Sequence, residues 1–462
     1  MFKKVLVANR GEIAVQIIRA LHEMSIQAVA IYSVADQDSL FVQLADEAVC
    51  IGAGPVNESY LNMQAIISAA NLTGCQAIHP GYGFLSENAT FATLCQACQL
   101  TFIGPDADVI AQMGDKATAR QTMKQLGVPV IPGSITILST VTDALASAQQ
   151  LGYPVMIKAT AGGGGKGIRV VNDEQALAQA FQTAKQEAKA SYDDGRLYLE
   201  KVIAPAKHIE VQVIADTQGH VVYLPERDCS LQRNHQKVIE ESPCALLTPT
   251  ERQQLGELVA AETKKLHYTN TGTFEFLMDQ QHQFYFLEMN TRLQVEHTVT
   301  EMVTGLELIK AQVLVAAKMP LPFSQDEVQV NGVAIECRLN AEDPYHDFRP
   351  QPGQIKSLIY PMGTLGVRID AGVVAGSTIA PFYDSMIAKV IVHGKDRKTA
   401  IAKMRRCLDE LVLTGVQTNR EFLSGLLTSE VVKQATYTTE YIQQDFLKEW
   451  LTDASTQISS AN

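Results

Sequence analysis

The sequence predicts an α/β and α+β multidomain protein, and three patterns lead to this prediction. Residues 1–113 alternate short apolar runs with stretches of helical periodicity, which is typical of a parallel sheet covered by helices. A glycine-rich loop at 161–171 joins two strand-like runs, and residues 272–290 favour a hairpin. Residues 332–392 favour further strands, and helices are expected over about 301–318 and over 397–411.

Composition excludes several classes of protein. The 462 residues suggest about three domains, and a hydrophobic content of 46% allows large cores, although no apolar run is long enough to cross a bilayer. A net charge of −12 argues against general nucleic-acid binding. Eight scattered cysteines favour a reducing, cytoplasmic location. Cys95 and Cys98 fall in a helical pattern without a second pair at zinc spacing, which indicates helix packing rather than a redox or metal site.

The first segment predicts a doubly wound parallel sheet. Asn9–Gly11 lies at its first strand-to-helix turn, where such sheets bind ligands or form interfaces. A nicotinamide-type cofactor is not favoured, because residues 51–55 (IGAGP) form only a fragment of the dinucleotide fingerprint. Strands are expected at 5–8, 28–32, 48–51, 77–79 and 102–103, and helices at 12–24 and 113–127.

The glycine-rich loop follows a strand that carries a lysine. Gly152–Ala159 delivers Lys158 to the loop Ala161–Val171. Consecutive glycines let backbone N–H groups approach phosphate oxygens closely. The loop is not a P-loop, because Lys166 is followed by Gly167 and a strand comes next. A flexible hairpin tip is the alternative, but Lys158 favours a phosphate site.

Charged side chains then alternate with strand patterns. The strand at 197–201 leads into Glu200–Ile203, where backbone groups and a carboxylate suit an adenine ring. Residues 208–216 alternate strictly between apolar and polar positions. Residues 226–241 are dense in charge, and a solvated surface and an anion site both remain open interpretations.

The predicted hairpin concentrates the polar chemistry. Its first strand carries Glu275 and its second Glu288, which brings two carboxylates together. Hard oxygen donors of this kind suit Mg²⁺ or Mn²⁺ shared with substrate phosphates, although surface acids without a metal are the alternative. From Glu288 onward, polar groups occupy every second position, which predicts one face of an extended segment: Glu288, Asn290, Arg292, Gln294 and Glu296.

Long motifs in a fixed order resemble biotin carboxylase, the ATP-grasp component of biotin-dependent carboxylases. The resemblance extends to about residue 445 and rests on VANRGEIA (7–14), AIHPGYGFLSEN (77–88), MGDK (113–116), GGGGKGIRVV (162–171), ERDCSLQRNHQK (226–237), GTFEFL (272–277), EMNTRLQVEH (288–297) and ECRLNAEDP (336–344). It implies a Rossmann-like N-terminal domain (1–113), an ATP-grasp domain (114–330) with a mobile lid at about 131–203, a β-rich C-terminal domain (331–446) and a frayed tail (447–462).

The resemblance also implies site residues. ATP contacts match Lys116, Lys158, Gly164, Gly165, Glu200, Lys201, Val202, Ile203, His208 and His235. Glu275, Glu288 and Asn290 match the family's metal ligands, and two Mg²⁺ or Mn²⁺ ions are expected there. Four residues match the bicarbonate site: Lys237, Arg292, Gln294 and Val295. Glu296 matches the general base, and Arg338 matches the residue beside the biotin ureido group.

The implied reaction explains these residue types. Bicarbonate becomes a good nucleophile when Glu296 removes its proton and Arg292 holds the resulting anion. Its attack on ATP gives carboxyphosphate, with charge on the γ-phosphate neutralised by Mg²⁺, Lys116 and Lys158. Carboxyphosphate then releases CO₂ and phosphate in place, the phosphate deprotonates biotin, and Arg338 stabilises the enolate-like oxygen that results. The products are carboxybiotin, ADP and phosphate.

The resemblance further implies partners. AlaLysMet at 317–319 lacks the first methionine of a biotin acceptor, so biotin is expected on a separate carrier protein. Carboxyltransferase subunits are expected as further partners, and the chain itself is expected to form a homodimer. A subunit of acetyl-CoA carboxylase, supplying malonyl-CoA for fatty acids, is the expected setting. The alternatives are another acyl-CoA or pyruvate carboxylase, an amine-using ATP-grasp ligase, and a non-catalytic nucleotide sensor.

The sequence departs from the family pattern at four positions. Lys166 replaces an arginine that is common in the glycine loop, and Ala161 replaces a glycine at its start. Asn234 replaces a basic residue, and Thr298 replaces a proline after GluHis. These changes leave every named catalytic group in place and are expected to affect the rate of lid closure rather than the type of reaction.

Overall fold

The computed structural model describes residues 1–134, 137–160 and 168–452. The N-terminal sheet is parallel throughout, in the order β3-β2-β1-β4-β5, which confirms the predicted doubly wound fold. Its strands are β1 (Lys4–Val7), β2 (Gln27–Ser33), β3 (Glu47–Gly52), β4 (Ala77–His79) and β5 (Thr101–Phe102). The helices of this segment are α1 (Gly11–Glu23), α2 (Leu40–Leu44), α3 (Met63–Leu72), α4 (Ala89–Ala97) and α5 (Ala107–Gly114).

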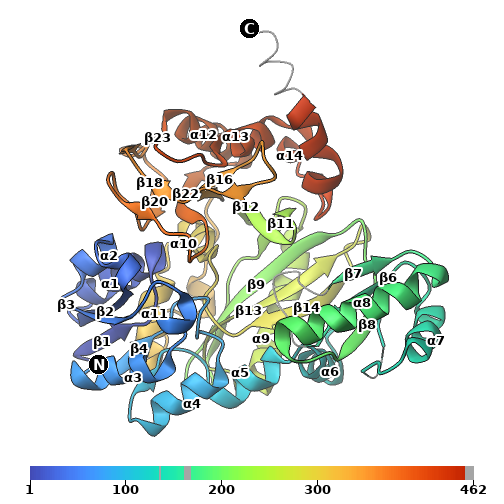
Figure 1. The fold of residues 1–462 in the computed structure, drawn as a ribbon, viewed down its shortest axis with the longest axis horizontal. Coiled ribbons are helices and arrows are strands. Elements are labelled where there is room, and N and C mark those ends of the chain that lie inside the picture. The colour runs from blue at the N-terminus through green and yellow to red at the C-terminus, as the bar shows by residue number, and fades with distance from the viewer. Residues whose placement is uncertain (135–136, 161–167, 453–462) are drawn as a thin grey trace.

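A long sheet, with strands from both the middle and the C-terminal part of the chain, forms the centre of the molecule (Figure 1). Its strands run in the order β14-β13-β9-β11-β12-β15-β22-β20, with β10 (Val221–Tyr223) paired to β9, and every neighbouring pair for which a register is defined is antiparallel. The strands are β9 (Lys207–Ala215), β11 (Arg227–Arg233), β12 (Gln236–Ser242), β13 (Asn270–Met278), β14 (Phe284–Asn290), β15 (Val333–Asn340), β20 (Val367–Ala371) and β22 (Met386–Gly394). The β12–β15 pairing therefore joins strands on both sides of the boundary predicted at residues 330 and 331 into one sheet. The predicted domain limits stay predictions.

The start of α9 beside this sheet has a clear local cause. Thr248 and Glu251 form a reciprocal capping box at the start of α9 (Pro249–Lys265), and Pro249 takes the first helical position, where its missing N–H costs nothing. The remaining helices of these segments are α6 (Lys116–Leu126), α10 (His297–Thr304), α11 (Leu308–Ala316), α12 (Arg397–Glu410), α13 (Arg420–Thr428) and α14 (Glu430–Lys433). None of the helices in the described ranges is long and apolar enough to cross a membrane.

A small separate sheet lies within the segment predicted as the lid. It has the antiparallel order β7-β6-β8 and is covered by two helices, and it lies beyond the β14 edge of the central sheet (Figure 1). The elements are β6 (Val155–Ala159), β7 (Arg169–Val171), β8 (Leu197–Lys201), α7 (Val141–Leu151) and α8 (Glu174–Tyr192). The glycine-rich residues 161–167, with Ala161, Gly164, Gly165 and Lys166, lie outside the described part of the chain.

Short strand pairs complete the C-terminal segment. They are β16 (Glu342–Asp343) with β17 (Arg349–Pro350), β18 (Gly353–Gln354) with β21 (Thr378–Ile379), and β19 (Ser357–Ile359) with β23 (Val412–Thr414). The prediction of a frayed tail from residue 447 is wrong for residues 447–452, which stay helical. Trp450 stacks on Tyr345 with ring centroids 4.9 Å apart, and this packing orders the end of the helix.

Two helix predictions need correction. The single helix expected over 113–127 is broken at Asp115, which has extended backbone angles and whose side chain accepts a hydrogen bond from the Thr118 N–H. This cap places Lys116 at the first position of α6. A single helix expected over 301–318 is likewise divided into α10 and α11, because Gly305 adopts a left-handed conformation that ends α10.

Candidate active site

The hairpin of β13 and β14 brings its two carboxylates together. Glu275 and Glu288 are directly opposite one another across the strand pair, which confirms the expected pairing. The Glu288 carboxylate lies 2.7 Å from Lys116 Nζ, at the start of α6. Asn290 ends β14, and its Nδ2 donates to Glu275 at 3.0 Å.

The extended segment predicted beyond Asn290 is wrong. Strand β14 ends there, and residues 291–296 form a bend and a turn before α10 begins. The Thr291 N–H donates to Glu87 at 3.0 Å, which turns the chain away from the sheet. The side chains still converge, because Gln294 Nε2 donates to Glu275 at 2.9 Å.

Arg292 contacts this group of side chains and is held by three side-chain partners. Its Nε donates to Glu87 at 2.7 Å, and its two terminal nitrogens donate to Gln294 Oε1 and Asn290 Oδ1, each at 2.7 Å. The guanidinium therefore has a fixed orientation above the hairpin. Glu87 belongs to a motif quoted for the family resemblance, but no pattern in the sequence indicated its contact with Arg292.

Lys237 lies at the centre of a buried group of carboxylates. Its Nζ donates to Glu210 at 2.5 Å, to Glu275 at 3.0 Å and to Glu296 at 2.5 Å. Burial alone would lower the pKa of Lys237, but the three carboxylates raise it well above its ordinary value. The ammonium group therefore stays charged and holds the carboxylates together.

His208 and Arg227 complete this buried group. His208 Nε2 lies 3.0 Å from Glu275 Oε2, and Arg227 Nε donates to Glu210 at 2.5 Å. Arg227 is fully buried, and its inclusion in the charge-dense stretch 226–241 is the only sequence signal for it. The buried groups within this stretch favour the anion-site interpretation over a solvated surface.

Glu296 lies at the start of α10 and is 1% exposed. Besides Lys237, it accepts a hydrogen bond at 2.7 Å from Arg338 of β15. Burial alone would raise the pKa of Glu296, but the charges of Lys237, Arg338 and Arg227 hold it well below its ordinary value. Glu296 is therefore an ionised carboxylate between two cations.

Arg338 links Glu296 to a second buried acid. Its Nε donates to Glu240 of β12 at 2.5 Å. Burial raises the pKa of Glu240 to about 7, against the opposing charge of Arg338. A small pocket of about 20 Å³ is lined by Arg338 and Lys237 together with Asn340 and Asn419, so both cations border the same polar cavity.

Several of the residues expected to bind ATP come from the small sheet, from the segment that follows β8, and from the turn between β11 and β12. Lys158 and Glu200 are both buried and form an ion pair on β6 and β8. Lys201 points elsewhere, because its Nζ donates to the carbonyl oxygens of Gly152 and Tyr153 at 2.8 and 3.0 Å. Val202 and Ile203 follow β8 and are half-buried, and His235 is exposed at the turn between β11 and β12.

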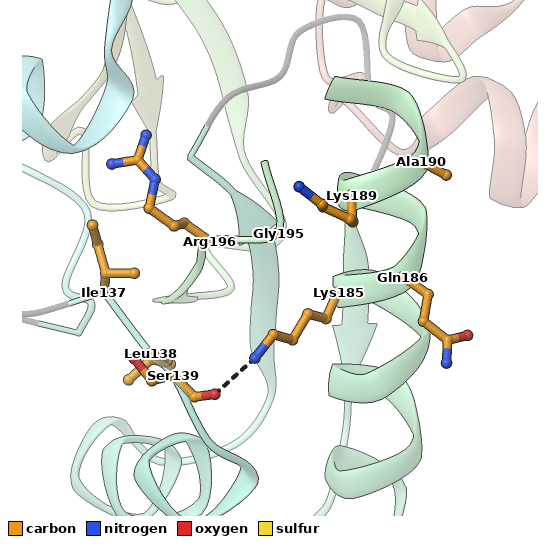
Figure 2. Close-up of a pocket in the computed structure, with 9 residues that line it drawn as sticks. All are labelled: Ile137, Leu138, Ser139, Lys185, Gln186, Lys189, Ala190, Gly195 and Arg196. Carbon is orange, nitrogen blue, oxygen red and sulfur yellow. Dashed lines mark hydrogen bonds between the residues drawn. The ribbon is translucent and has the colours of Figure 1, made fainter. Parts of the chain in front are cut away.

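One pocket lies away from this chemistry. It has a volume of about 700 Å³ and lies between α8 and the segments around Leu138 and Arg196 (Figure 2). Lys185 Nζ donates to the Ser139 carbonyl at 2.9 Å across it, and Arg196 pairs with Asp194. No carboxylate is among its nine lining residues, so the candidate active site is the group around Glu275 and Glu296 instead.

The donor set at the hairpin suits a divalent cation. Glu275 and Glu288 offer carboxylate oxygens and Asn290 an amide oxygen, which are the hard ligands that Mg²⁺ and Mn²⁺ prefer. Cationic side chains already lie against the two carboxylates, Lys116 at Glu288 and Lys237 at Glu275. Positive charge is thus favourable at this position, and the residues fit the expected metal.

The parallel sheet, the central sheet with its lid segment and the carboxylate hairpin define an ATP-grasp ligase. The family "Biotin carboxylase, N-terminal domain" matches residues 1–110, "Carbamoyl-phosphate synthase L chain, ATP binding domain" matches 115–324, and "Biotin carboxylase C-terminal domain" matches 336–444. The chain belongs to the biotin carboxylase family. It is an ATP-dependent ligase that carboxylates biotin with bicarbonate and uses Mg²⁺.

Individual relatives match over nearly their whole length. Biotin carboxylase 1 of Bacillus subtilis is 52% identical over 444 residues, which cover 96% of this chain and 98% of the relative. The biotin carboxylase of Haemophilus influenzae is 48% identical over 445 residues, covering 96% and 99%. A crystal structure of the biotin carboxylase domain dimer of Hydrogenobacter thermophilus 2-oxoglutarate carboxylase, with MgADP, ADP and bicarbonate, has a TM-score of 0.94 at 46% identity, covering 96% and 98%.

Proposed function

We propose that the chain is the biotin carboxylase subunit of an acetyl-CoA carboxylase and that the group around Glu296 is its catalytic site. The observation that carries the site assignment is the Glu296 carboxylate, which is buried and held between Lys237 and Arg338. A carboxylate in this position can accept the bicarbonate proton, while both neighbouring cations favour a bound anion.

The bicarbonate site lies between the hairpin and the turn that follows it. Arg292 and Lys237 supply positive charge, and Gln294 and the Val295 backbone supply polar groups beside Glu296. Lys237 Nζ is 2.5 Å from Glu296, so an anion bound by Lys237 lies within reach of the base. Loss of the proton to Glu296 makes bicarbonate the nucleophile that attacks the γ-phosphate of ATP.

Arg338 is the group that acts on biotin. Its guanidinium borders the small pocket that Lys237 also lines, and it donates to Glu296 at 2.7 Å. When the ureido nitrogen of biotin loses its proton, charge develops on the ureido oxygen, and a fixed guanidinium stabilises that charge. Lysine would supply the charge without the planar fork that contacts two partners at once.

ATP is held by groups from both sides of the hairpin. Lys116 and Lys158 contact the phosphates, Glu200–Ile203 contacts the adenine, and His208 and His235 complete the set, together with Gly164 and Gly165 of the glycine-rich loop. Lys201 contributes through its backbone, because its side chain is held by the carbonyl oxygens of residues 152 and 153. Glu275, Glu288 and Asn290 would hold Mg²⁺, and a bound ion would supply positive charge beside the transferred phosphoryl group.

The subunit receives biotin on a separate carrier protein and forms a homodimer in the cytoplasm. The eight unpaired cysteines are consistent with a reducing compartment. Ile359 and Val412 are cross-strand partners and are exposed, and exposed Met362 and Leu365 follow in the next loop. An apolar surface of this kind, on a chain 46% identical to a domain crystallised as a dimer, supports association through this face.

Arg338→Ala tests the assignment of the biotin step. We expect this variant to lose carboxybiotin formation by about two orders of magnitude or more, because it removes one preorganised donor. Part of the bicarbonate-dependent ATP cleavage should remain, because Lys237 still lies beside Glu296. Transfer of radiolabelled bicarbonate to free biotin and release of ADP are measured on the same samples, and equal loss of both would place Arg338 before the biotin step.

Another carboxylase is the second candidate. The biotin carboxylase subunit of a pyruvate carboxylase is 47% identical with a TM-score of 0.83, and the 2-oxoglutarate carboxylase domain is similar at a comparable level. The acceptor of the carboxyl group is selected by a different component. Combining this chain with its own carrier and carboxyltransferase, and supplying acetyl-CoA, pyruvate or 2-oxoglutarate, distinguishes the candidates.

A further inference from the structure

The turn that carries Glu296 is attached to the C-terminal part of the central sheet. Lys389 of β22 is fully buried, and its Nζ donates to the Val295 carbonyl oxygen at 2.8 Å. One residue later, the Glu296 carboxylate accepts from Arg338 of β15 at 2.7 Å. Arg338 and Lys389 are directly opposite one another in the β15–β22 register, so both attachments come from one face of the sheet.

A third attachment follows two residues after Glu296. The Thr298 hydroxyl, at the second position of α10, donates to the Glu336 carboxylate of β15. Both residues are fully buried. Glu336 precedes Arg338 by two positions, which places the two side chains on the same face of the strand. Thr298 is also the position at which the sequence departs from the proline of the family pattern.

The sheet end of these attachments is itself fixed by neighbouring charge. Lys389 Nζ lies 3.2 Å from Glu12 of α1 and 4.0 Å from Asp370 of β20. A Cβ at Gly372 would lie 2.6 Å from the Gly11 carbonyl carbon, so only glycine allows α1 to approach this sheet so closely. The lysine therefore has little freedom, and a displacement of it would move the Val295 carbonyl.

We propose that the Thr298 hydroxyl and Lys389 are positioning groups that fix the separation between Glu296 and Arg338 and so govern transfer of the carboxyl group to biotin. This inference rests on the proposed function, in which Glu296 and Arg338 serve successive steps. The attachments through Lys389 and Thr298 hold residues 295–298 at both ends, so the loss of either one leaves this turn held at one end only. The Glu296 carboxylate and the Arg338 guanidinium are then no longer held at a fixed separation.

Thr298→Val tests the proposal, because valine keeps the shape of threonine and removes the hydroxyl. We expect the kcat for carboxybiotin formation to fall about 10-fold to 100-fold, the scale expected for a misplacement of about 1 Å. The KM for ATP should stay unchanged, and the ratio of carboxybiotin to released ADP should fall. Thr298→Ser, which restores the hydroxyl, should return kcat and this ratio close to their wild-type values.

Thr304→Val is the matched control. Thr304 lies at the end of the same helix, and its hydroxyl donates to the Thr300 carbonyl at 2.7 Å within α10. The control should carboxylate biotin at the wild-type rate. If Thr298→Val does not fold, Thr298→Ala removes the hydroxyl without placing a methyl group against Glu336, and the same losses are expected.

The outcomes separate the inference from the proposed function. Wild-type kcat and an unchanged ratio of carboxybiotin to ADP in Thr298→Val or Thr298→Ala overturn the positioning role, as does a Thr298→Ser variant as defective as Thr298→Val. A wild-type enzyme that carboxylates no biotin while hydrolysing ATP overturns the proposed function instead. A fall in kcat with rescue by serine supports the inference.

Discussion

Glu296 shows how charge outweighs burial at a single residue. A carboxyl group that is 1% exposed would ordinarily hold its proton, yet Lys237 and Arg338 keep the pKa of Glu296 low. In the proposed site, a bicarbonate bound by Lys237 would compete with Glu296 for that ammonium group and weaken its charge stabilisation. Glu296 would then gain proton affinity when bicarbonate binds.

Glu296→Gln should abolish most of the carboxylation and leave ATP binding intact. We expect a loss of about two or more orders of magnitude in the rate of carboxybiotin formation, the scale of a general base. The Kd for ATP should match that of the wild type, because the side-chain partners of Glu296 are Lys237 and Arg338 and not the Lys158–Glu200 pair. Isothermal titration and a carboxybiotin assay measure the two quantities, and unchanged turnover would remove Glu296 from its role.

Glu336 predicts a pH dependence of stability. Burial raises its pKa to about 8, against the charge of Lys389, and Glu240 adds to the rise. The unfolded chain ionises this group near its ordinary value of 4.5, so between about pH 4.5 and 8 only the folded form holds the proton. Through this group, the free energy of unfolding falls by roughly 1.4 kcal/mol per pH unit in that window.

Glu336→Gln removes that dependence, because glutamine does not ionise. We expect the variant to gain unfolding free energy relative to the wild type as the pH rises from about 5 to about 8. Urea unfolding at several pH values measures the difference between the two proteins. A difference that stays constant with pH would show that Glu336 is ionised in the folded protein throughout.

The hairpin shows what sequence patterns can predict at the scale of an element. The pairing of Glu275 with Glu288 follows from strand alternation and a short turn, and the structure contains it. The same alternation failed after Asn290, because contacts with the distant Glu87 decide the path of the chain there. Local periodicity carries no information about such long-range partners, and the roles of Glu210 and Lys389 escaped prediction for the same reason.

Glu288→Gln tests the metal site on this hairpin. Loss of one carboxylate oxygen donor should raise the Mg²⁺ concentration for half-maximal ATP cleavage by about tenfold or more, because hard cations depend on ligand charge. Glu257→Gln is the control, since Glu257 is on the surface of α9 and accepts from Gln253. Equal Mg²⁺ requirements in the two variants would contradict the assignment.

At the scale of the whole molecule, three groups of the proposed site come from one continuous sheet. Glu275, Lys237 and Arg338 lie on β13, β12 and β15, and the β12–β15 pairing joins segments that the sequence presents as separate. The α/β and α+β class was predictable from periodicity, and the family motifs supplied the candidate residues. The continuity of the sheet was not predictable, because strand order depends on pairings between residues about 100 positions apart.

The proposed dimer predicts an effect of one surface residue. Leu365 is 94% exposed near the exposed Met362, and aspartate there would place charge in an apolar interface. We expect Leu365→Asp to sediment as a monomer and the wild type as a dimer. Leu72→Asp is the matched control, since Leu72 is 85% exposed at the end of α3, and a monomer in that control or a dimer in Leu365→Asp would contradict the assigned face.

The release of ADP from Mg²⁺-ATP, with and without bicarbonate and with and without free biotin, tests the central claim most directly. The account predicts that ADP release requires bicarbonate and rises when biotin is added, because carboxyphosphate forms first and biotin consumes the CO₂ that it releases. ADP release that is independent of bicarbonate, or that biotin leaves unchanged at every concentration, would contradict it.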